Sequence, residues 1–311
     1  MTTLTEETRV GGTARWLPVA AIGVTVVLWA SAFVAIRHVA QDVSAGALAL
    51  GRLLVAGLVL GIAVLVQTRR RTAEDEGWPR RALWPRLLAC GVLWLGLYNV
   101  ALNEAERTID AGTAAMLVNV GPILIAVLAG LFLGEGFPRQ LLVGSLIAFG
   151  GVVLIGAATS SIAVAKAWGA ALSLVAAGAY ATGVITQKPL LAEVSGLRVT
   201  WLACVIGAAV CLPFAPALVR DLGSAPASSV WWIVYLGVMP TALAFSTWAY
   251  ALARSTAGRL GAATYLAPPI AILLGWLLLG ETPAALAFVG GAICLAGVYV
   301  ARRAPRRLAR A

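Results

Sequence analysis

The chain has 311 residues, of which 61% are hydrophobic even before its 33 glycines are counted, and only 12% are charged. Charged residues make up about a quarter of a soluble domain, so this chain has too few to cover a globule of its size, and the same numbers exclude a disordered chain. The net charge is +10, but the arginines lie in patches between apolar runs. This placement argues against nucleic-acid binding and indicates contact with anionic lipid headgroups. The composition therefore predicts a polytopic membrane protein.

Ten apolar runs follow one another along the chain, each close to the roughly 20 residues that a helix needs to cross a bilayer. They begin near Leu17, Ser44, Leu87, Ala111, Pro138, Trp168, Val199, Val230, Gly258 and Ala284. The runs are too long for barrel strands and show no strict alternation of apolar and polar residues. We therefore expect an all-α polytopic membrane protein with ten transmembrane helices.

The positive charges predict how these helices are oriented. With the N-terminus inside, 18 of the 23 lysines and arginines fall on the inner side, 4 on the outer side, and Arg52 within a span. Such an excess marks the cytoplasmic face. We expect both termini to be cytoplasmic, with residues 1–16 as an N-terminal tail and residues 302–311 as a basic C-terminal tail.

An internal repeat is visible at an offset of 146 positions. The residues that match in register are Ala111-Gly112 with Ala257-Gly258, Pro122 with Pro268, and Gly134-Glu135 with Gly280-Glu281. Each half holds five helices, and since five is odd, the second half must enter the membrane from the opposite face. The sequence thus predicts two inverted repeats, 17–157 and 168–301, an arrangement that many secondary transporters use for alternating access.

Prolines interrupt the same helix in each half. Pro122 lies about halfway along the fourth helix, and Pro268 and Pro269 lie about halfway along the ninth. A proline frees the carbonyl four residues earlier, and in lipid that carbonyl must find a partner. The breaks are either simple packing kinks or the edge of a translocation cavity, and their symmetry favours the cavity.

Polar and aromatic residues gather at the same depth on several helices. The predicted cavity lining is Trp29, Ser31, Arg52, Trp94, Tyr98, Asn99, Asn119, Tyr180, Trp248 and Tyr265. Rings for a carbon skeleton and amides or hydroxyls for polar ends suit a small amphipathic solute. For any single ring the alternative is the aromatic belt at the membrane surface.

Four charged residues have two interpretations each. Arg52 stands in the middle of an apolar run, where it either grips a substrate carboxylate and takes part in coupling, or locks two helices together. Glu104 either relays protons or faces water. Glu135 and Glu281 each precede a helix that starts with proline, so they complement the positive end of that helix or form gating contacts.

The sequence contains no metal-ligand cluster, phosphate-binding loop or nucleophile–base motif that would indicate an enzyme. Its four cysteines lie inside apolar runs without metal or disulfide spacing. We expect no cofactor, no metal and no catalytic residue, so a solute or ion gradient must supply the energy for any transport.

Several motifs resemble the EamA-type members of the drug/metabolite transporter superfamily. They are WASAFVAIRHV in the first helix, LALGRLLVAG in the second, the paired starts DAGTAAM and TAGRLGAA, and a proline followed after eleven residues by Gly-Glu in each half. The resemblance spans roughly Leu17 to Ala301. It implies two inverted EamA repeats in the bacterial inner membrane and the transport of small metabolites, commonly export of amino acids in exchange for protons. Ala30 departs from the glycine usual in the family.

The leading hypothesis is a secondary transporter that exports amino acids or related amphipathic metabolites, as a monomer or homodimer. Uptake or efflux of cationic drugs is one alternative. A non-transporting membrane protein, such as a lipid-handling enzyme or a scaffold, is the other.

Overall fold

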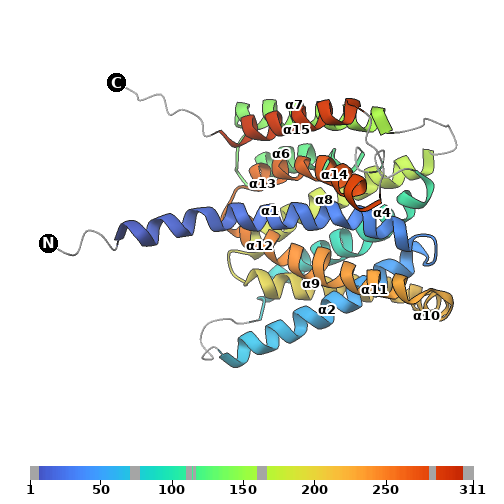
Figure 1. Ribbon diagram of the computed structural model, residues 1–311. Coiled ribbons are helices and arrows are strands. Elements are labelled where there is room, and N and C mark those ends of the chain that lie inside the picture. The colour runs from blue at the N-terminus through green and yellow to red at the C-terminus, as the bar shows by residue number, and fades with distance from the viewer. Residues whose placement is uncertain are drawn as a thin grey trace, which may run out of the picture.

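The fold is a bundle of helices in which the first helix begins and the last helix ends on the same side (Figure 1). The computed structural model describes residues 7–70, 78–109, 114, 117–159, 167–279 and 285–303. In the first half the elements are α1 (Glu7–Val39), α2 (Ala45–Arg70), η1 (Arg81–Leu83), α3 (Trp84–Ala89), η2 (Cys90–Leu97), α4 (Tyr98–Thr108), α6 (Gly121–Phe132) and α7 (Arg139–Thr159). In the second half they are α8 (Ala167–Leu190), α9 (Gly196–Cys211), η4 (Leu212–Phe214), α10 (Ala215–Ser224), α11 (Ala227–Leu236), η5 (Gly237–Leu243), α12 (Ala244–Ala253), α13 (Ala257–Ala263), η6 (Thr264–Leu266), α14 (Ala267–Leu279) and α15 (Ala285–Arg302).

The ten expected membrane crossings are present. Within the described ranges, seven continuous helical stretches of 22 to 29 residues are long and apolar enough to span a bilayer. Three shorter apolar helices, Gly121–Phe132, Arg139–Leu154 and Phe288–Ala301, supply the remaining crossings. The prediction of an all-helical polytopic fold is confirmed.

Helix packing follows the internal repeat. The first helix of the first half, α1, packs on α12 and α14 of the second half. Its counterpart α8 packs on η2, α4 and α6 of the first half, so the same contact is made twice in opposite directions. The second helices α2 and α9 pack on each other, and each also contacts the other half's π-helical segment, η5 or η2. The two halves therefore interlock and do not form separate domains.

The last helices of the two halves, α7 and α15, lie side by side along one edge of the bundle (Figure 1). The thiol Sγ of Cys294 lies 3.3 Å from the carbonyl oxygen of Ala148. These two residues are 146 positions apart, which is the repeat offset. Residues related by a twofold axis contact each other only where they lie beside that axis, so the pseudo-twofold axis passes through this contact.

Glycines allow α7 and α15 to approach at backbone distance. A Cβ added to Gly151 would lie 2.5 Å from the carbonyl oxygen of Gly290, and one added to Gly144 would lie 2.6 Å from that of Gly297. Gly144 and Gly290 are repeat mates, as are Gly151 and Gly297, so the two contacts are equivalent under the pseudo-twofold. Small residues provide such close packing where lipid supplies no hydrophobic driving force between helices.

Irregular turns occur at matching places in the two halves. The third crossing contains the π-helix η2 and the eighth contains the π-helix η5, separated by the repeat offset. The ninth crossing changes from α13 through the 3₁₀ turn η6 to α14, with Pro268 and Pro269 in the first turn of α14. The fourth crossing has a turn at Asn119 and Val120 before α6, which contains Pro122. Both halves thus carry one π segment and one proline-associated break.

The adjacent glycines of α7 provide a matched test of this packing. Gly151→Ala places a methyl group against the backbone of α15, whereas nothing lies within 4 Å of a Cβ added to Gly150. Overpacking of this kind costs about 1–3 kcal/mol, so we expect Gly151→Ala to lower the thermal midpoint of the detergent-purified protein by several degrees. Gly150→Ala should leave the midpoint unchanged. Equal midpoints for the two variants would contradict the close approach of α7 and α15.

Candidate functional site

A cluster of aromatic rings occupies the centre of the bundle. Trp29 of α1, Trp94 of η2, Tyr180 of α8, and Phe245 and Trp248 of α12 contact one another. The ring centroids of Trp94 and Phe245 are 4.9 Å apart, and those of Trp29 and Trp248 are 5.1 Å apart. Edge and tilted arrangements of this kind stabilise aromatic pairs. Four crossings from both halves therefore meet through apolar faces.

Two of these rings correspond to each other in the repeat. The first crossings of the two halves are offset by 151 positions and not 146, since α1 ends at Val39 and α8 at Leu190; at this offset Trp29-Ala-Ser-Ala aligns with Tyr180-Ala-Thr-Gly. The Trp29 and Tyr180 rings contact each other edge to face, with centroids 6.1 Å apart. The cluster therefore lies at the meeting place of the two halves, where transporters built from inverted repeats hold their substrate.

A cavity of about 70 Å³ adjoins this cluster. Its wall consists of Trp29, Ala32, Phe33, Ile36, Arg52, Trp94, Tyr98, Asn99, Leu102, Val118, Asn119, Pro122, Tyr180, Phe245, Thr264 and Ala267. This volume holds only a few water molecules, far below the roughly 300–1,000 Å³ of an open ligand site. The site is contracted, and a solute must displace side chains or helices to enter it.

Arg52 contributes the positive charge of the cavity wall. Its side chain is 4% exposed, and its Nε–H donates a hydrogen bond to Oγ1 of Thr241, 3.0 Å away in η5. The Thr241 hydroxyl in turn donates to the carbonyl oxygen of Leu236 at 2.7 Å. The π-helix of the second half thus orients an arginine of the first half. A buried guanidinium whose Nε–H bonds a neutral hydroxyl favours an anionic group beside it.

Some buried polar atoms in and near the site are incompletely satisfied. Nδ2 of Asn99 donates to the carbonyl oxygen of Leu95 at 2.7 Å, and Nδ2 of Asn103 donates to that of Ala45 at 3.1 Å. Nε1 of Trp29 and Oδ1 of Asn103 are buried with no hydrogen-bond partner among the residues described. Buried polar atoms normally have partners. Trp29 lines the cavity, so its Nε1–H is free to bond a polar solute or water, whereas Asn103 lies outside the cavity wall.

The structure brings together most, though not all, of the predicted lining. Trp29, Arg52, Trp94, Tyr98, Asn99, Asn119 and Tyr180 line the cavity, as does Pro122.

Three predicted lining residues lie elsewhere. The Ser31 hydroxyl contacts the Tyr235 hydroxyl at 2.7 Å and donates to its own helix, so it supports the contact of α1 with α11. Trp248 packs behind Trp29, outside the cavity wall. Tyr265 is fully buried among residues of α7 and α15. These residues have the expected depth, but rotation about the helix axis directs their side chains away from the cavity.

Glu104, which we predicted either to relay protons or to face water, also points away from the cavity. Its side chain is 42% exposed, and its Oε2 lies 3.8 Å from Nε of Arg107, one turn along α4. Such a surface pair interacts weakly. The buried carboxylate of α4 is instead Glu106, which our sequence analysis missed. The spacing of Asn99, Asn103 and Glu106, four and then three residues, marks one helix face and was the available signal.

Phe33, Ile36, Phe245 and Thr264 are further lining residues that the sequence analysis did not single out. Apolar residues such as these are typical of every crossing, so their identity carried no signal.

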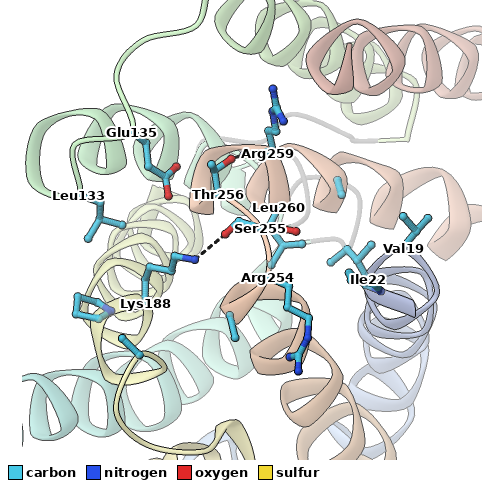
Figure 2. A pocket seen from close by; sticks show the side chains of 15 residues that line it. Val19, Ile22, Leu133, Glu135, Lys188, Arg254, Ser255, Thr256, Arg259 and Leu260 are labelled. Carbon is cyan, nitrogen blue, oxygen red and sulfur yellow. Dashed lines mark hydrogen bonds between the residues drawn. The ribbon is translucent and has the colours of Figure 1, made fainter. Parts of the chain in front are cut away.

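A second and larger hollow, of about 850 Å³, opens at the end of the bundle where α8 and α12 end and α13 begins (Figure 2). The ammonium of Lys188 donates to the carbonyl oxygens of Leu252, at 2.6 Å, and Ser255, at 2.7 Å. It thereby neutralises the carbonyl end of α12. We call this hollow the vestibule; Arg254 and Arg259 also line it.

Glu135 borders the vestibule and binds a different helix from the one we expected. Its Oε1 accepts a hydrogen bond from the backbone N–H of Ala257 at 2.6 Å, and its Oε2 accepts one from Gly258 at 3.1 Å. The carboxylate therefore complements the N-terminus of α13, in the other half, and not that of α7. This contact ties the loop after α6 to the broken ninth crossing. Glu281, its repeat mate, lies outside the described residues.

A thin partition separates the vestibule from the cavity. On the ninth crossing Ala263 lines the vestibule and the next residue, Thr264, lines the cavity, so the 3₁₀ turn η6 begins at the division. Val26 of α1 and Trp248 of α12 lie between vestibule and cavity residues along their own helices, and their exposed fractions are 2% and 0%. Of these two partition residues, Trp248 has the larger side chain.

Comparison with known proteins gives the same fold. The EamA-like transporter family matches residues 16–157 and 167–303. A crystal structure with 20% sequence identity superposes with a TM-score of 0.73 and covers 94% of this chain and 99% of that one. Both repeats and their arrangement are therefore shared with a solved protein.

Sequence relatives are transporters by name. The chain is 37% identical over 284 residues to a "Probable terminal-alkyne amino-acid exporter" of Streptantibioticus cattleyicolor, covering 91% of this chain and 92% of that one. It is 31% identical over 272 residues to the "Uncharacterized transporter YdfC" of Bacillus subtilis, with coverages of 87% and 86%. An "Uncharacterized transporter" of Archaeoglobus fulgidus is 29% identical, with coverages of 93% and 99%. The chain therefore belongs to the EamA-like transporter family, and it is a multi-pass membrane transporter of small molecules and not an enzyme.

Proposed function

We propose that this transporter exports amino acids or closely related small amphipathic metabolites across the bacterial inner membrane, by alternating access coupled to a proton gradient. The observation that carries the proposal is the cavity, in which Trp29, Trp94 and Tyr180 face a buried arginine, Arg52. Rings suit an apolar side chain, and a guanidinium suits the carboxylate of an amino acid. The name of the Streptantibioticus relative supports the same cargo class.

The positive charge of Arg52 argues against efflux of cationic drugs, the main rival within transport. A cation entering the cavity would lie beside a buried guanidinium, and burying like charges together is costly. An anionic or zwitterionic solute gains from the same group.

The charges at the vestibule support an orientation in the membrane. Lys188, Arg254 and Arg259 surround it, and positive residues concentrate at the cytoplasmic face of membrane proteins. We therefore place the vestibule and both termini in the cytoplasm, with the clusters around Arg69 and Arg302 against anionic lipid headgroups. In this orientation a cytoplasmic solute enters the vestibule, passes the partition at Trp248 and reaches the cavity. We retain a monomer or homodimer as the expected assembly.

The purified protein in proteoliposomes tests the cargo class. We expect an imposed pH gradient to drive uptake of radiolabelled apolar amino acids, including those with a terminal alkyne, and not of the amines that lack their carboxyl group. Empty liposomes are the control. If no member of a broad amino-acid panel moves, or if the amines move equally well, the proposed cargo class is wrong.

Substitution of Arg52 tests its role in binding. A hydrogen bond to a charged group contributes about 1.5–3 kcal/mol, so Arg52→Ala should weaken apparent affinity for amino acids about 10- to 150-fold. Arg52→Lys, which keeps the charge but loses the planar fork, should fall between Arg52→Ala and the natural protein. Affinity is measured by concentration-dependent uptake, and protein level by fluorescence-detected gel filtration. A fall in protein level as large as the fall in transport would instead assign Arg52 a structural role.

Thiol labelling tests the partition. The four native cysteines are buried, so they give a low background. The reporter is an Asn99→Cys protein, labelled with a membrane-impermeant thiol reagent applied from the vestibule side. Adding Trp248→Ala to this protein should increase the labelling rate at least about tenfold, because a large side chain of the partition is removed. Trp231→Ala is the matched control, since Trp231 is 72% exposed on α11. An unchanged rate would show that the vestibule and cavity do not communicate past Trp248.

A further inference from the structure

Glu106 is a carboxylate buried inside the membrane-spanning part of α4. Both of its side-chain oxygens are inaccessible to solvent, and neither has a hydrogen-bond partner among the residues described. An ionised carboxylate in such a place is far more costly than a neutral one, because burial removes its water and no donor replaces it. The geometry of this state therefore suits the protonated form of Glu106.

Glu106 lies on the face of α4 that leads to the cavity. Leu102, one turn earlier, lines the cavity, and Asn99, two turns earlier, does so as well. Glu106 itself is not part of the cavity wall. It therefore occupies the stretch between the cavity and the end of α4 at Thr108, opposite the vestibule.

Charged groups reach Glu106 from two neighbouring helices. Arg52 lies on α2 and Arg37 lies near the end of α1, and both helices pack on α4; Tyr98 lies on α4 itself. The long partner α8 carries Lys188, but that residue contacts α12 at the vestibule, at the opposite end. Glu104 and Arg107 on α4 pair with each other.

This arrangement makes the proton affinity of Glu106 depend on conformation. Burial favours the neutral carboxyl group, whereas an approaching guanidinium favours the carboxylate. α4 packs on α8 of the second half and on α2, whereas α1 packs mainly on α12 and α14 and only lightly on α4. A movement of α1 relative to α4 changes the distance from Glu106 to Arg37, a rotation of the Arg52 side chain changes the distance from Glu106 to that guanidinium, and either change alters whether a proton is held.

We propose that Glu106 is the proton-binding residue of this transporter and that it releases its proton when Arg52 or Arg37 moves toward it. This inference rests on the proposed proton-coupled transport, and it names the group that carries the coupling ion. The proton leaves the Glu106 carboxyl for water on the side to which the site opens, and the resulting carboxylate is stabilised by a guanidinium. The solute occupies the cavity, one turn away, and makes no contact with the carboxylate.

Proteoliposomes containing Glu106→Gln test this assignment, because glutamine mimics the protonated carboxyl group. We expect exchange of labelled for unlabelled solute, without a pH gradient, to stay within about twofold of the natural protein. Accumulation driven by a pH gradient should fall at least about tenfold, and an entrapped pH dye should report no solute-dependent proton flux. Glu104→Gln is the matched control and should leave all three measurements unchanged.

Other results would overturn the proposal. Gradient-driven accumulation retained by Glu106→Gln would show that the proton binds elsewhere. Loss of solute exchange in a well-folded variant, judged by gel filtration and thermal midpoint, would make Glu106 a solute ligand, for instance for the ammonium group of an amino acid.

A measurement on the natural protein remains informative if the variant does not fold or if no solute is found. Dicyclohexylcarbodiimide reacts with protonated carboxyl groups in apolar surroundings. Peptide mass spectrometry should find Glu106 modified, faster at acid than at alkaline pH, and Glu104 unmodified. Absence of modification at Glu106, or a rate independent of pH, would contradict the proton site whatever the cargo. Modification at Glu106 without transport of any amino acid would contradict the proposed function alone.

Discussion

The pseudo-twofold relation between two oppositely inserted halves is the constraint on which the structure depends. Where α7 meets α15, Cys294 touches its own repeat mate Ala148, and paired glycines bring the two backbones together. Each of the remaining crossings then meets a partner from the other half in a contact that occurs twice. A substrate site at the centre of such a bundle is necessarily built from both halves, which is why Arg52 of one half is held by Thr241 of the other.

The same symmetry explains why a small cavity and a large vestibule coexist. If both ends of the bundle were equivalent, the two halves would be in identical conformations. The vestibule lies at the end where Glu135 holds the start of α13 and Lys188 holds the end of α12. The opposite end contains the buried Glu106 and the end of α4. The structure thus represents one of two asymmetric arrangements, and the broken ninth crossing lies at the border between its two hollows.

Sequence was sufficient to predict the number of crossings, which depends on the length of the apolar runs, and the repeat, which depends on matched glycines and prolines. It also predicted which residues share one depth, because depth follows from counting residues along each run. It placed Trp29, Trp94, Tyr98 and Tyr180 correctly at one level, and the structure brings them together. Depth alone does not fix the rotation of a helix about its axis. Trp248 therefore lies beside the expected wall and not in it.

The two glutamates of α4 show the same limit more sharply. Glu104 and Glu106 differ by two residues, or about 200° around the helix, so the Glu104 side chain faces outward while both carboxylate oxygens of Glu106 are inaccessible to solvent. Both glutamates are visible in the sequence, and the one feature that favours Glu106 is its position on the same helix face as Asn99 and Asn103. The partner helix of Glu135 could not be predicted either. The sequence suggested α7, the next helix along the chain, whereas α13 is adjacent to Glu135 only in the folded bundle.

The paired π-helical segments have a consequence for the origin of the molecule. A π turn bonds each residue to the fifth one along instead of the fourth, and such turns are rare. η2 and η5 occur at mated positions in helices that cross the membrane in opposite directions. Two independent acquisitions at the same place are less economical than one inheritance, which favours an ancestral five-helix unit that already contained this turn. In an inverted dimer of such a unit the counterparts of Ala148 and Cys294 would meet across the dimer interface; in this chain the same contact is enclosed within one molecule.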